Sequence, residues 1–375
     1  MIALTAPRLF DGTALRRDGV VVIDGDRIAA IAGDVPAGAT ATALPADTML
    51  APGFIDLQVN GGGGVMLNDA VTVDAMRGIA AAHARCGTTT ILPTLISGTR
   101  AQLRQALDAA GAAIAQRVPG IAGLHLEGPF IALARRGIHP AAAVTAMTEA
   151  DVALLAAHRL FPLLLTLAPD AVSPDMVARL AQAGVVVFAG HTDAVYDQVR
   201  AALAAGASGF THLFNAMSPF ASRAPGAVGA ALAHRDAYAG IIVDGHHVHP
   251  ASVAAAFAAK GAARLFLVSD AMATAGSDVR KFTLNGQTIR LQDGRLTDDA
   301  GTLAGAHLTM ADAVRNAVRL AGIPLAEALR MATATPAACM CLADRGRLAA
   351  GCRADLVALD RELRVVAVWQ GGVRL

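Results

Sequence analysis

Several short apolar stretches of the chain end in a side chain that can bind a metal ion or transfer a proton. Glu127 follows LHL, His191 follows VVFAG and His212 follows GFT. One carboxylate and two imidazoles are a typical ligand set for a catalytic zinc ion, because three protein ligands leave one coordination position open. Each residue alone is more often structural, but three of them at the ends of three strands favour a shared site. The sequence therefore predicts a metal-dependent hydrolase.

A second chemical element is Asp270, which ends the apolar run LFLVSD. A carboxylate in such a stretch is costly to bury unless the group is used. Beside a water molecule activated by a metal ion, it could take a proton during attack and return it to the leaving group. The alternative is an N-cap for the segment that follows. We expect Asp270 to act as the general base and acid.

The first apolar strand, GFIDLQVN, ends in two neutral amides, Gln58 and Asn60. Amides are poor ligands for transition metal ions, so we expect one ion rather than two. The amides could instead hold water or substrate hydroxyls, or fill the barrel. Side chains alternate along a strand, so His125 faces the same side as Glu127. We expect His125 to fill the barrel or to support a ligand rather than to bind metal directly.

Composition excludes several classes of function. The chain has 375 residues and a formal net charge of +1, so a nucleic-acid partner is not expected. Alanine inflates the hydrophobic content, and the longest stretch without a formal charge, residues 201–222, contains too many polar residues for a membrane span. The start MIALTAPRLFDGT is unlike a signal peptide. Four cysteines without zinc-finger spacing indicate reduced thiols, and we expect a cytoplasmic protein.

The elements that must position these residues alternate between strand and helix. Eight near-continuously apolar strands are expected, which is typical of parallel strands covered on both faces. A doubly wound sheet also alternates, but its ligands gather at one switch point rather than at many strand ends. The sequence therefore predicts a TIM-type (β/α)8 barrel over residues 51–343. Helices are expected over residues 73–85, 100–116, 149–158, 174–182, 194–204, 251–260, 307–320 and 325–339.

Both ends of the chain are expected to form short strands. VVVIDGDRIAAIA has a hairpin signal at Asp24-Gly25, and ADLVALD and LRVVAVWQGGVRL close the sequence. Neither end is stable alone, so residues 1–50 and 344–375 should combine into one small β-sandwich domain. The segment 276–306 has hairpin turns at Asn285-Gly286 and Asp293-Gly294, and it could cover the barrel mouth or join the β domain.

At these residues the chain resembles the N-acetylglucosamine-6-phosphate deacetylase family of the amidohydrolase superfamily. The resemblance extends almost end to end, and its most specific strings are HLEGPF and THLFNAM. It also rests on PGFIDLQVNGGGG, AGHTDA, DGHHV, LVSDAM and GTLAG. The Gln-x-Asn form of the first strand resembles the single-metal branch. The resemblance implies hydrolysis of N-acetylglucosamine 6-phosphate to glucosamine 6-phosphate and acetate, in amino-sugar metabolism.

The resemblance also implies roles for individual residues. Glu127, His191 and His212 match the metal ligands, for one divalent ion per subunit with zinc as the default. Asp270 matches the proton donor and acceptor, and His139 should lie near the acetyl carbonyl. A homodimer is implied, in which the phosphate-binding arginine comes from the neighbouring subunit. The expected substrate contacts are Gln58, Ile138, His139, Asn215, Ala216, Arg223, His247, Leu303, Ala304 and Gly305.

Three alternatives to this function stay open at the level of sequence. One is another amidohydrolase, acting on an N-acyl amino acid or a cyclic amide; Arg223 and His247 favour a phosphorylated substrate instead. Another is a non-catalytic regulator that binds a sugar phosphate without metal, against which the joint presence of the ligand set and Asp270 argues. The third is a structural scaffold, which explains none of the polar strand ends.

Overall fold

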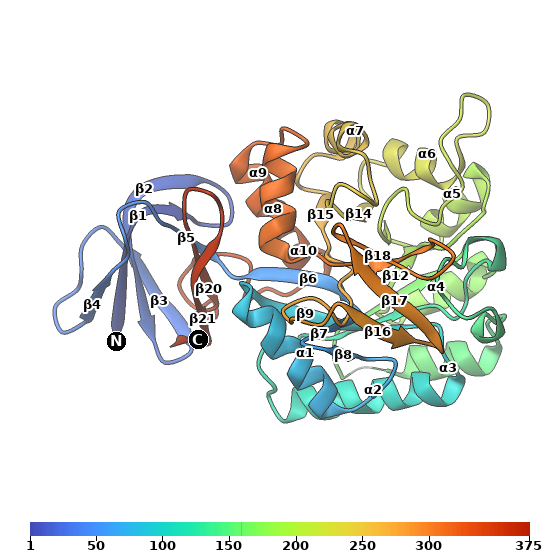
Figure 1. The fold of residues 1–375 in the computed structure, drawn as a ribbon, viewed down its shortest axis with the longest axis horizontal. Coiled ribbons are helices and arrows are strands. Elements are labelled where there is room, and N and C mark those ends of the chain that lie inside the picture. The colour runs from blue at the N-terminus through green and yellow to red at the C-terminus, as the bar shows by residue number, and fades with distance from the viewer. Residues whose placement is uncertain (159) are drawn as a thin grey trace.

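The computed structural model describes residues 1–158 and 160–375, and its centre is a barrel of parallel strands (Figure 1). The strands run side by side in chain order, each paired in parallel with the next. Between the first and last strands, Val59 bridges Ala271, and the Asp270 N–H donates to the Gln58 carbonyl at 3.1 Å. This near-closed eight-stranded barrel confirms the predicted fold class. The barrel strands are β6 (Phe54–Val59), β9 (Thr88–Ile96), β10 (Leu124–Glu127), β11 (Leu163–Leu167), β12 (Val186–Ala189), β13 (Gly209–Phe210), β14 (Tyr238–Ile241) and β15 (Leu265–Leu267).

The helices begin where the sequence supplies capping residues. Thr72, Thr99, Thr148 and Ser173 each accept a hydrogen bond from a backbone N–H in the first turn, which satisfies an otherwise unpaired donor. The predicted helices accordingly lie within a few residues of the observed ones. The helices are α1 (Val73–Arg85), α2 (Arg100–Ala115), α3 (Glu149–Ala157), α4 (Pro174–Gln182), α5 (Tyr196–Ala204), α6 (Gly226–Ala233), α7 (Pro250–Lys260), α8 (Met310–Arg319), α9 (Leu325–Met331) and α10 (Ala334–Cys339).

Two helical predictions need correction. Residues 325–339 form two helices rather than one, because Pro336 lacks an N–H and its ring would collide with the carbonyl one turn earlier in a continuous helix. The chain breaks at Thr333, whose φ of −135° and ψ of −83° are not helical. Helix α6 was not predicted at all. Its sequence, GAVGAALA, is apolar all round and therefore carries no amphipathic pattern.

Strands from both ends of the chain share one sheet beside the barrel, where both termini lie (Figure 1). The C-terminal strand β20 pairs antiparallel with β5, and β5 pairs in turn with β1, so the two ends stabilise each other as expected. The domain boundaries at residues 50 and 344 stay a prediction. The strands are β1 (Ile2–Phe10), β2 (Leu15–Asp24), β3 (Arg27–Ala32), β4 (Thr40–Ala43), β5 (Met49–Pro52), β20 (Leu356–Leu359), β21 (Val365–Gln370) and β22 (Val373–Arg374).

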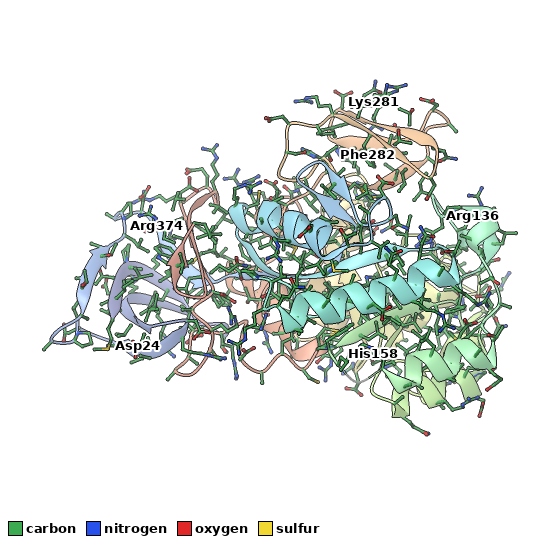
Figure 2. The ribbon with its side chains drawn as sticks, turned by 90° about the horizontal axis from the view of Figure 1, so that it is seen from below. Asp24, Arg136, His158, Lys281, Phe282 and Arg374 are labelled. Atoms are coloured by element: carbon green, nitrogen blue, oxygen red, sulfur yellow. The ribbon has the colours of Figure 1, made fainter. Side chains whose placement is uncertain are left out.

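The segment after β15 forms a separate four-stranded sheet over the barrel mouth. Its strands are β16 (Lys281–Leu284), β17 (Gln287–Gln292), β18 (Arg295–Thr297) and β19 (Leu303–Ala306). The predicted turns are present, since Asn285, Gly286, Asp293 and Gly294 all have the positive φ that tight hairpin turns require. Lys281 and Phe282 lie far from Asp24 and Arg374 of the terminal sheet (Figure 2). The insertion therefore covers the barrel and does not join the terminal sheet.

A small apolar core attaches this hairpin sheet to the barrel. Leu284, Ile289 and Leu296 pack with Met66 and Met272, and all five are buried. Met66 belongs to a short two-stranded sheet, β7 (Gly61–Gly62) with β8 (Val65–Met66), that follows the first barrel strand. The cover is thus held by side-chain packing at the rim. In the described part of the chain, no helix combines the length and apolar character needed to cross a bilayer.

We predict that Ile289→Ala lowers the free energy of unfolding by about 2–4 kcal/mol, because Ile289 is fully buried and its truncation leaves a cavity under the hairpin sheet. Urea denaturation followed by circular dichroism measures the change. Leu320→Ala is the control, since that side chain is 49% exposed, and it should shift stability by no more than about 0.5 kcal/mol. Equal shifts for the two variants would contradict the packing role.

Candidate functional site

A cavity of about 400 Å³ opens at the carboxyl ends of the barrel strands, beneath the hairpin sheet. Its lining comes from segments far apart in the chain, which the barrel brings to one rim. Most of the residues expected from the sequence are among them. The lining comprises Asn60, Ile96, Glu127, Gly137, Ile138, His139, His191, His212, Asn215, Ala216, His247, Asp270, Met272, Gly301, Thr302, Leu303 and Gly305.

Glu127, His191 and His212 form the most compact group in this cavity. Glu127 Oε1 lies 3.2 Å from His191 Nε2 and 3.0 Å from His212 Nε2, and the two nitrogens are 3.0 Å apart. All three side chains are buried. Burial alone would raise the pKa of Glu127, but the two neighbouring imidazoles hold its pKa well below the usual range. Glu127 is therefore an anion with two imidazoles directed at one of its oxygens.

The protonation of His191 shows that this group fits a metal ion. His191 Nδ1 lies 2.8 Å from the backbone carbonyl of Arg135, which can only accept, so Nδ1 carries the proton. In the neutral ring Nε2 is then bare and faces the carboxylate oxygen of Glu127. Two acceptors at this distance are held together by a positive charge between them, which a divalent metal ion or a proton can supply. The separations are close to the roughly 3.3 Å expected between ligands of a tetrahedral ion with bonds of about 2.0 Å.

A second combination of possible ligands overlaps with the first. Glu127, His139 and His191 also have ligand atoms within 4.8 Å of one another. We favour His212 over His139 as the third ligand, because His212 Nε2 makes both 3.0 Å contacts. His212 Nδ1 is buried without a partner among the described residues, which leaves that nitrogen available to hold the proton when Nε2 binds a metal.

His139 is oriented to donate a hydrogen bond into the cavity. Its Nδ1 lies 3.3 Å from the backbone N–H of Ser97 and 2.7 Å from Ser97 Oγ. A nitrogen that accepts from a backbone N–H carries no proton, so in the neutral ring the proton is on Nε2. Burial, together with neighbouring His191, holds the pKa of His139 well below its usual range and keeps the ring neutral. The Nε2–H can stabilise negative charge on an oxygen in the cavity.

Asp270 lies beside this group and is held by two amides from the first barrel strand. Its Oδ1 accepts from Asn60 Nδ2 at 2.6 Å and from Gln58 Nε2 at 3.1 Å. Gln58 Nε2 also donates to Glu127 Oε1 at 3.0 Å, so one amide links the two carboxylates. Burial and the charge of Glu127 raise the pKa of Asp270 to about 6. A carboxyl group with this pKa can both accept and return a proton near neutral pH.

The backbone at three of these residues adopts a conformation that L-amino acids rarely use. His191, His212 and Asp270 have φ values of 48°, 30° and 50°, in the left-handed region. Each follows directly after, or shortly after, a barrel strand, where the chain turns away from the strand direction. Such strain of about 1–3 kcal/mol per residue persists only where the surroundings enforce it, and it is concentrated at functional sites.

His247 also lines the cavity, and its orientation is fixed. Its Nδ1 is 2.6 Å from Asp244 Oδ2, and both side chains are at least nine-tenths buried. Burial would raise the pKa of Asp244, but the hydrogen bonds from His247 outweigh this effect and lower its pKa to about 2. With Nδ1 donating to Asp244, Nε2 is the nitrogen left to contact a ligand.

Three of the expected substrate contacts do not line the cavity. Gln58 lies below it, bonded to Glu127 and Asp270, and lines a small void inside the barrel instead. Ala304 is fully buried in the core under the hairpin sheet. Arg223 is exposed and lines a different cavity of about 460 Å³ next to α5 and α6. The other expected contacts lie at the rim.

His125 lies inside the barrel and not in the cavity. Its Nε2 is 2.8 Å from Thr166 Oγ1, and its Nδ1 is 3.3 Å from Thr94 Oγ1. Burial lowers the pKa of His125 to about 4, so the ring is neutral. The hydroxyl contacts of both nitrogens agree with a supporting role.

Two residues that orient the site were not expected from the sequence: Ser97 orients His139, and Asp244 orients His247. Ser97 directly follows a barrel strand, so the strand-end pattern that identified Glu127 could have included it. Asn60 was expected to hold water or substrate, or to fill the barrel, and instead donates to Asp270. Met272, Gly301 and Thr302 belong to the strings LVSDAM and GTLAG, but no individual role was expected for them.

Comparisons with known proteins show which family the chain belongs to. The sequence pattern of the amidohydrolase family matches residues 49–374. An N-acetylgalactosamine-6-phosphate deacetylase of Shewanella sp. is 46% identical over 330 residues, which cover 88% of this chain and 83% of the relative. An N-acetylglucosamine-6-phosphate deacetylase of Haemophilus influenzae is 34% identical over 362 residues, covering 95% and 94%.

Solved structures of deacetylases share the whole fold. The crystal structure of N-acetylglucosamine-6-phosphate deacetylase from Pasteurella multocida has a TM-score of 0.96 at 34% identity and covers 100% of this chain and 99% of its own. A mutant of the deacetylase from Mycobacterium smegmatis, solved in complex with N-acetyl-D-glucosamine-6-phosphate, has a TM-score of 0.92 at 35% identity, covering 100% and 98%.

We predict that His139 in the metal-free protein at pH 7 is neutral with its proton on Nε2, because Nδ1 accepts from the Ser97 N–H. Long-range nitrogen–proton correlation NMR of the histidine rings distinguishes the two tautomers. In Ser97→Ala the hydroxyl contact is lost but the backbone N–H remains, so the proton should stay on Nε2. A proton found on Nδ1 in the wild-type protein would contradict the assigned orientation.

Proposed function

Because the chain belongs to the amidohydrolase family, we propose that its barrel site hydrolyses the N-acetyl group of N-acetylglucosamine 6-phosphate, giving glucosamine 6-phosphate and acetate. One observation carries the proposal: Glu127, His191 and His212 converge within 3.2 Å in the same cavity as Asp270. Amide hydrolysis needs an activated nucleophile and a proton for the leaving nitrogen, and this cavity has residues for both.

We infer that Glu127, His191 and His212 hold one divalent ion per subunit, with zinc as the ion of choice for a carboxylate and two imidazoles. A divalent ion bound there would polarise the acetyl carbonyl and lower the pKa of water to about 7. On the first strand, the positions next to this group are the amides Asn60 and Gln58, which donate hydrogen bonds to the carboxylates of Asp270 and Glu127. These amides do not provide ligands for a second ion. This supports one ion rather than two.

Asp270 moves the proton in this proposal. Its carboxylate takes a proton from the attacking water and then delivers it to the amide nitrogen, because nitrogen leaves readily only when protonated. Asn60 and Gln58 both bond Oδ1, so the proton is carried by Oδ2. The fixed amides thus determine which carboxylate oxygen reacts.

Binding of the acetamido sugar is assigned to the remaining lining residues. The Nε2–H of His139 donates to the acetyl oxygen as negative charge develops on it. Ile138, Leu303 and Gly305 border the cavity where an acetyl group would lie, and His247 with Asn215 contact the sugar phosphate. Gln58 acts through Asp270 and Glu127 rather than by touching substrate.

One finding favours a second substrate of the same class. The relative with 46% identity is an N-acetylgalactosamine-6-phosphate deacetylase, whereas the N-acetylglucosamine-6-phosphate deacetylase of H. influenzae is 34% identical. The two sugars differ only in the orientation of one hydroxyl group, so both would present the same acetamide and phosphate to the cavity. We therefore keep N-acetylgalactosamine 6-phosphate as the alternative substrate.

The proposal predicts that the protein releases acetate from N-acetylglucosamine 6-phosphate, that chelation abolishes this activity, and that added zinc restores it. Acetate release is measured with both hexosamine phosphates and with unphosphorylated N-acetylglucosamine, and bound metal is quantified by mass spectrometry. The expected content is one ion per chain, lost in His212→Ala. A kcat/KM for N-acetylglucosamine equal to that for its 6-phosphate would rule out phosphate recognition, and activity in the metal-free protein would rule out the mechanism.

We predict that Asp270→Asn lowers kcat by about 10²–10⁴-fold and leaves metal content and ligand affinity intact, because the amide keeps the shape of the side chain but cannot accept the proton. Steady-state kinetics with metal analysis measures both effects. Asp175→Asn on α4, with its side chain 80% exposed, is the matched control and should retain full activity. A kcat near the wild-type value would remove Asp270 from proton transfer.

We further infer that the active unit is a homodimer in which Arg223 reaches the partner's phosphate site. Arg223 does not line the cavity of its own chain but lies in an exposed loop beside α5 and α6. Val195 and Phe220 on the same side are 61% and 64% exposed, which leaves large apolar side chains available for a partner. Guanidinium groups suit phosphate because they can donate two parallel hydrogen bonds.

The dimer proposal predicts that the protein elutes at twice the chain mass of 38.0 kDa in size-exclusion chromatography with light scattering. Arg223→Ala should remain a dimer and raise KM for the phosphorylated substrate by about 10–100-fold, since a charge-assisted bidentate contact is lost. Phe220→Asp should dissociate the dimer and raise KM in the same way. A fully active monomer would disprove the shared site.

A further inference from the structure

We propose that a second cavity, at the opposite end of the barrel from the metal site, binds a small organic phosphate ester. The cavity has a volume of about 480 Å³, similar to that of the catalytic cavity and within the usual range for small-molecule sites. The inference does not depend on the proposed deacetylase reaction. Its lining residues are Tyr238, Ala263, Arg264, Arg330, Ala334, Thr335, Ala337, Ala338, Cys341, Leu342, Ala343, Arg345 and Arg347.

The strand directions place this cavity on the rim opposite the metal site. Tyr238 is the first residue of β14, and Arg264 directly precedes β15. The other end of β15 leads to Asp270 in the catalytic cavity. At about 3.3 Å per residue, the extended chain from Arg264 to Asp270 spans roughly 20 Å. A ligand in the second cavity therefore touches none of the groups assigned to catalysis.

The charged side chains that line the cavity are all positive. Four arginines line it, and in the described part of the chain no aspartate or glutamate is among the lining residues. Arg345 is paired, since its Nε lies 3.0 Å from Asp344 Oδ1. Arg264, Arg330 and Arg347 make no ion pair within 4.0 Å with any described carboxylate. Three guanidinium groups around one hollow leave positive charge uncompensated, which favours an anionic ligand.

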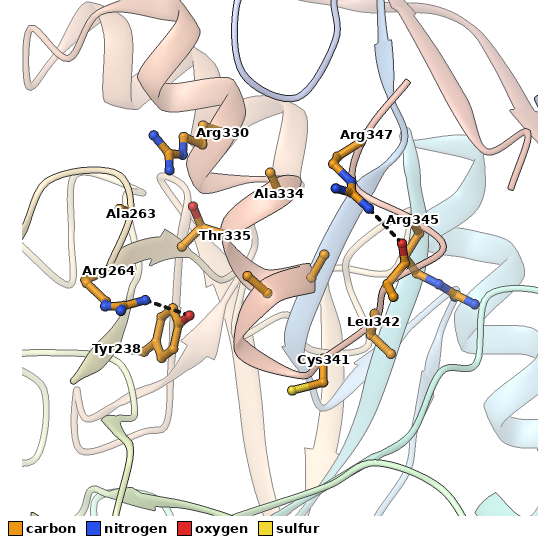
Figure 3. A pocket seen from close by; sticks show the side chains of 13 residues that line it. Tyr238, Ala263, Arg264, Arg330, Ala334, Thr335, Cys341, Leu342, Arg345 and Arg347 are labelled. Carbon is orange, nitrogen blue, oxygen red and sulfur yellow. Dashed lines mark hydrogen bonds between the residues drawn. The ribbon is translucent and has the colours of Figure 1, made fainter. Parts of the chain in front are cut away.

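The arginines are arranged around a surface of small residues. Arg264 and Arg330 lie on one side of α10 and Arg347 on the other, with Ala334 and Thr335 of the helix between them (Figure 3). Two of the three are held in place. Arg264 Nη1 donates to Tyr238 Oη at 2.8 Å with its guanidinium 4.6 Å from the ring centroid, and Arg347 Nη2 donates to the Ala343 carbonyl at 3.0 Å.

Arg264 and Arg347 each use only one N–H donor in a side-chain hydrogen bond within the protein. A guanidinium has five N–H donors, so most remain free for a ligand. Arg330 is half-buried, and its guanidinium makes no hydrogen bond to another described residue. Planar, forked donors of this kind match both carboxylate and phosphate oxygens. Three uncompensated guanidinium groups favour the phosphate, because a phosphate ester has three acceptor oxygens and a charge of about −1.5 to −2.

The rest of the lining selects the body of the ligand. Ala334, Ala337, Ala338 and Leu342 give a shallow apolar surface, and Thr335 Oγ1 is already bonded to the Ala262 carbonyl at 2.5 Å. Few polar groups are left to recognise sugar hydroxyls. A flat, weakly polar ring fits such a surface and can also stack on a guanidinium plane. A nucleoside monophosphate has both the ring and the phosphate ester.

Isothermal titration calorimetry tests the proposal, with adenosine 5′-monophosphate added to the whole, metal-loaded protein. Adenosine is the control ligand, because it has the same ring and sugar without the phosphate. The variants are Arg330→Gln and the double variant Arg330→Gln with Arg347→Gln. Arg104→Gln on α2 is the control, because this exposed arginine lies outside the cavity. Melting curves verify folding, and the single Arg330 variant keeps the test valid if the double variant does not fold.

We expect the monophosphate to bind at least about tenfold more tightly than adenosine. The double variant should lose at least about tenfold in affinity, Arg330→Gln a smaller factor, and Arg104→Gln none. His247→Ala, a change in the catalytic cavity, should leave the affinity unchanged, because the two cavities are on opposite rims. Absence of binding, equal affinity in wild type and both variants of the second cavity, or a loss of affinity in His247→Ala would each overturn the proposal.

Discussion

The structure depends on the approach of three electron-rich groups at one point. Glu127 Oε1, His191 Nε2 and His212 Nε2 lie within 3.2 Å of one another, although the His191 proton is committed to the Arg135 carbonyl. Groups that all offer lone pairs repel one another unless a cation lies between them. A buried anion beside two imidazoles is therefore suited to bind a positive ion. The surrounding fold is rigid and keeps these three side chains close together.

That rigidity comes from the turns after the strands and from the amides on the first strand. His191, His212 and Asp270 have left-handed backbone conformations where the chain leaves the strands, and all three line the cavity. Gln58 then joins Glu127 and Asp270 through a single Nε2 group, so the cluster of one carboxylate and two imidazoles shares one scaffold with Asp270. In a relative with histidines at the two amide positions, the same strand could ligate a second ion; in this chain it supports carboxylates instead.

Much of the fold followed from local sequence patterns. Capping residues such as Thr72 and Ser173 marked where helices begin, and Asn285-Gly286 and Asp293-Gly294 marked the hairpins. Prediction failed where the pattern was absent or interrupted. Helix α6 is apolar on every side, and Pro336 divides a segment whose hydrophobic spacing reads as continuous. Helix α6 forms because of its packing, and the break between the other two helices is caused by a steric clash. Local sequence patterns predict neither.

The sequence by itself determined the chemical groups: a carboxylate and two imidazoles at strand ends, and an aspartate at the end of another strand. Only the tertiary structure decided how these groups are used. It assigned Gln58 to the carboxylates below the cavity, revealed Ser97 and Asp244 as the residues that orient His139 and His247, and put Arg223 on a different surface. The physical reason is that residue type limits which bonds a side chain can form, while the partner it bonds depends on which distant segments the barrel closure brings within about 3 Å.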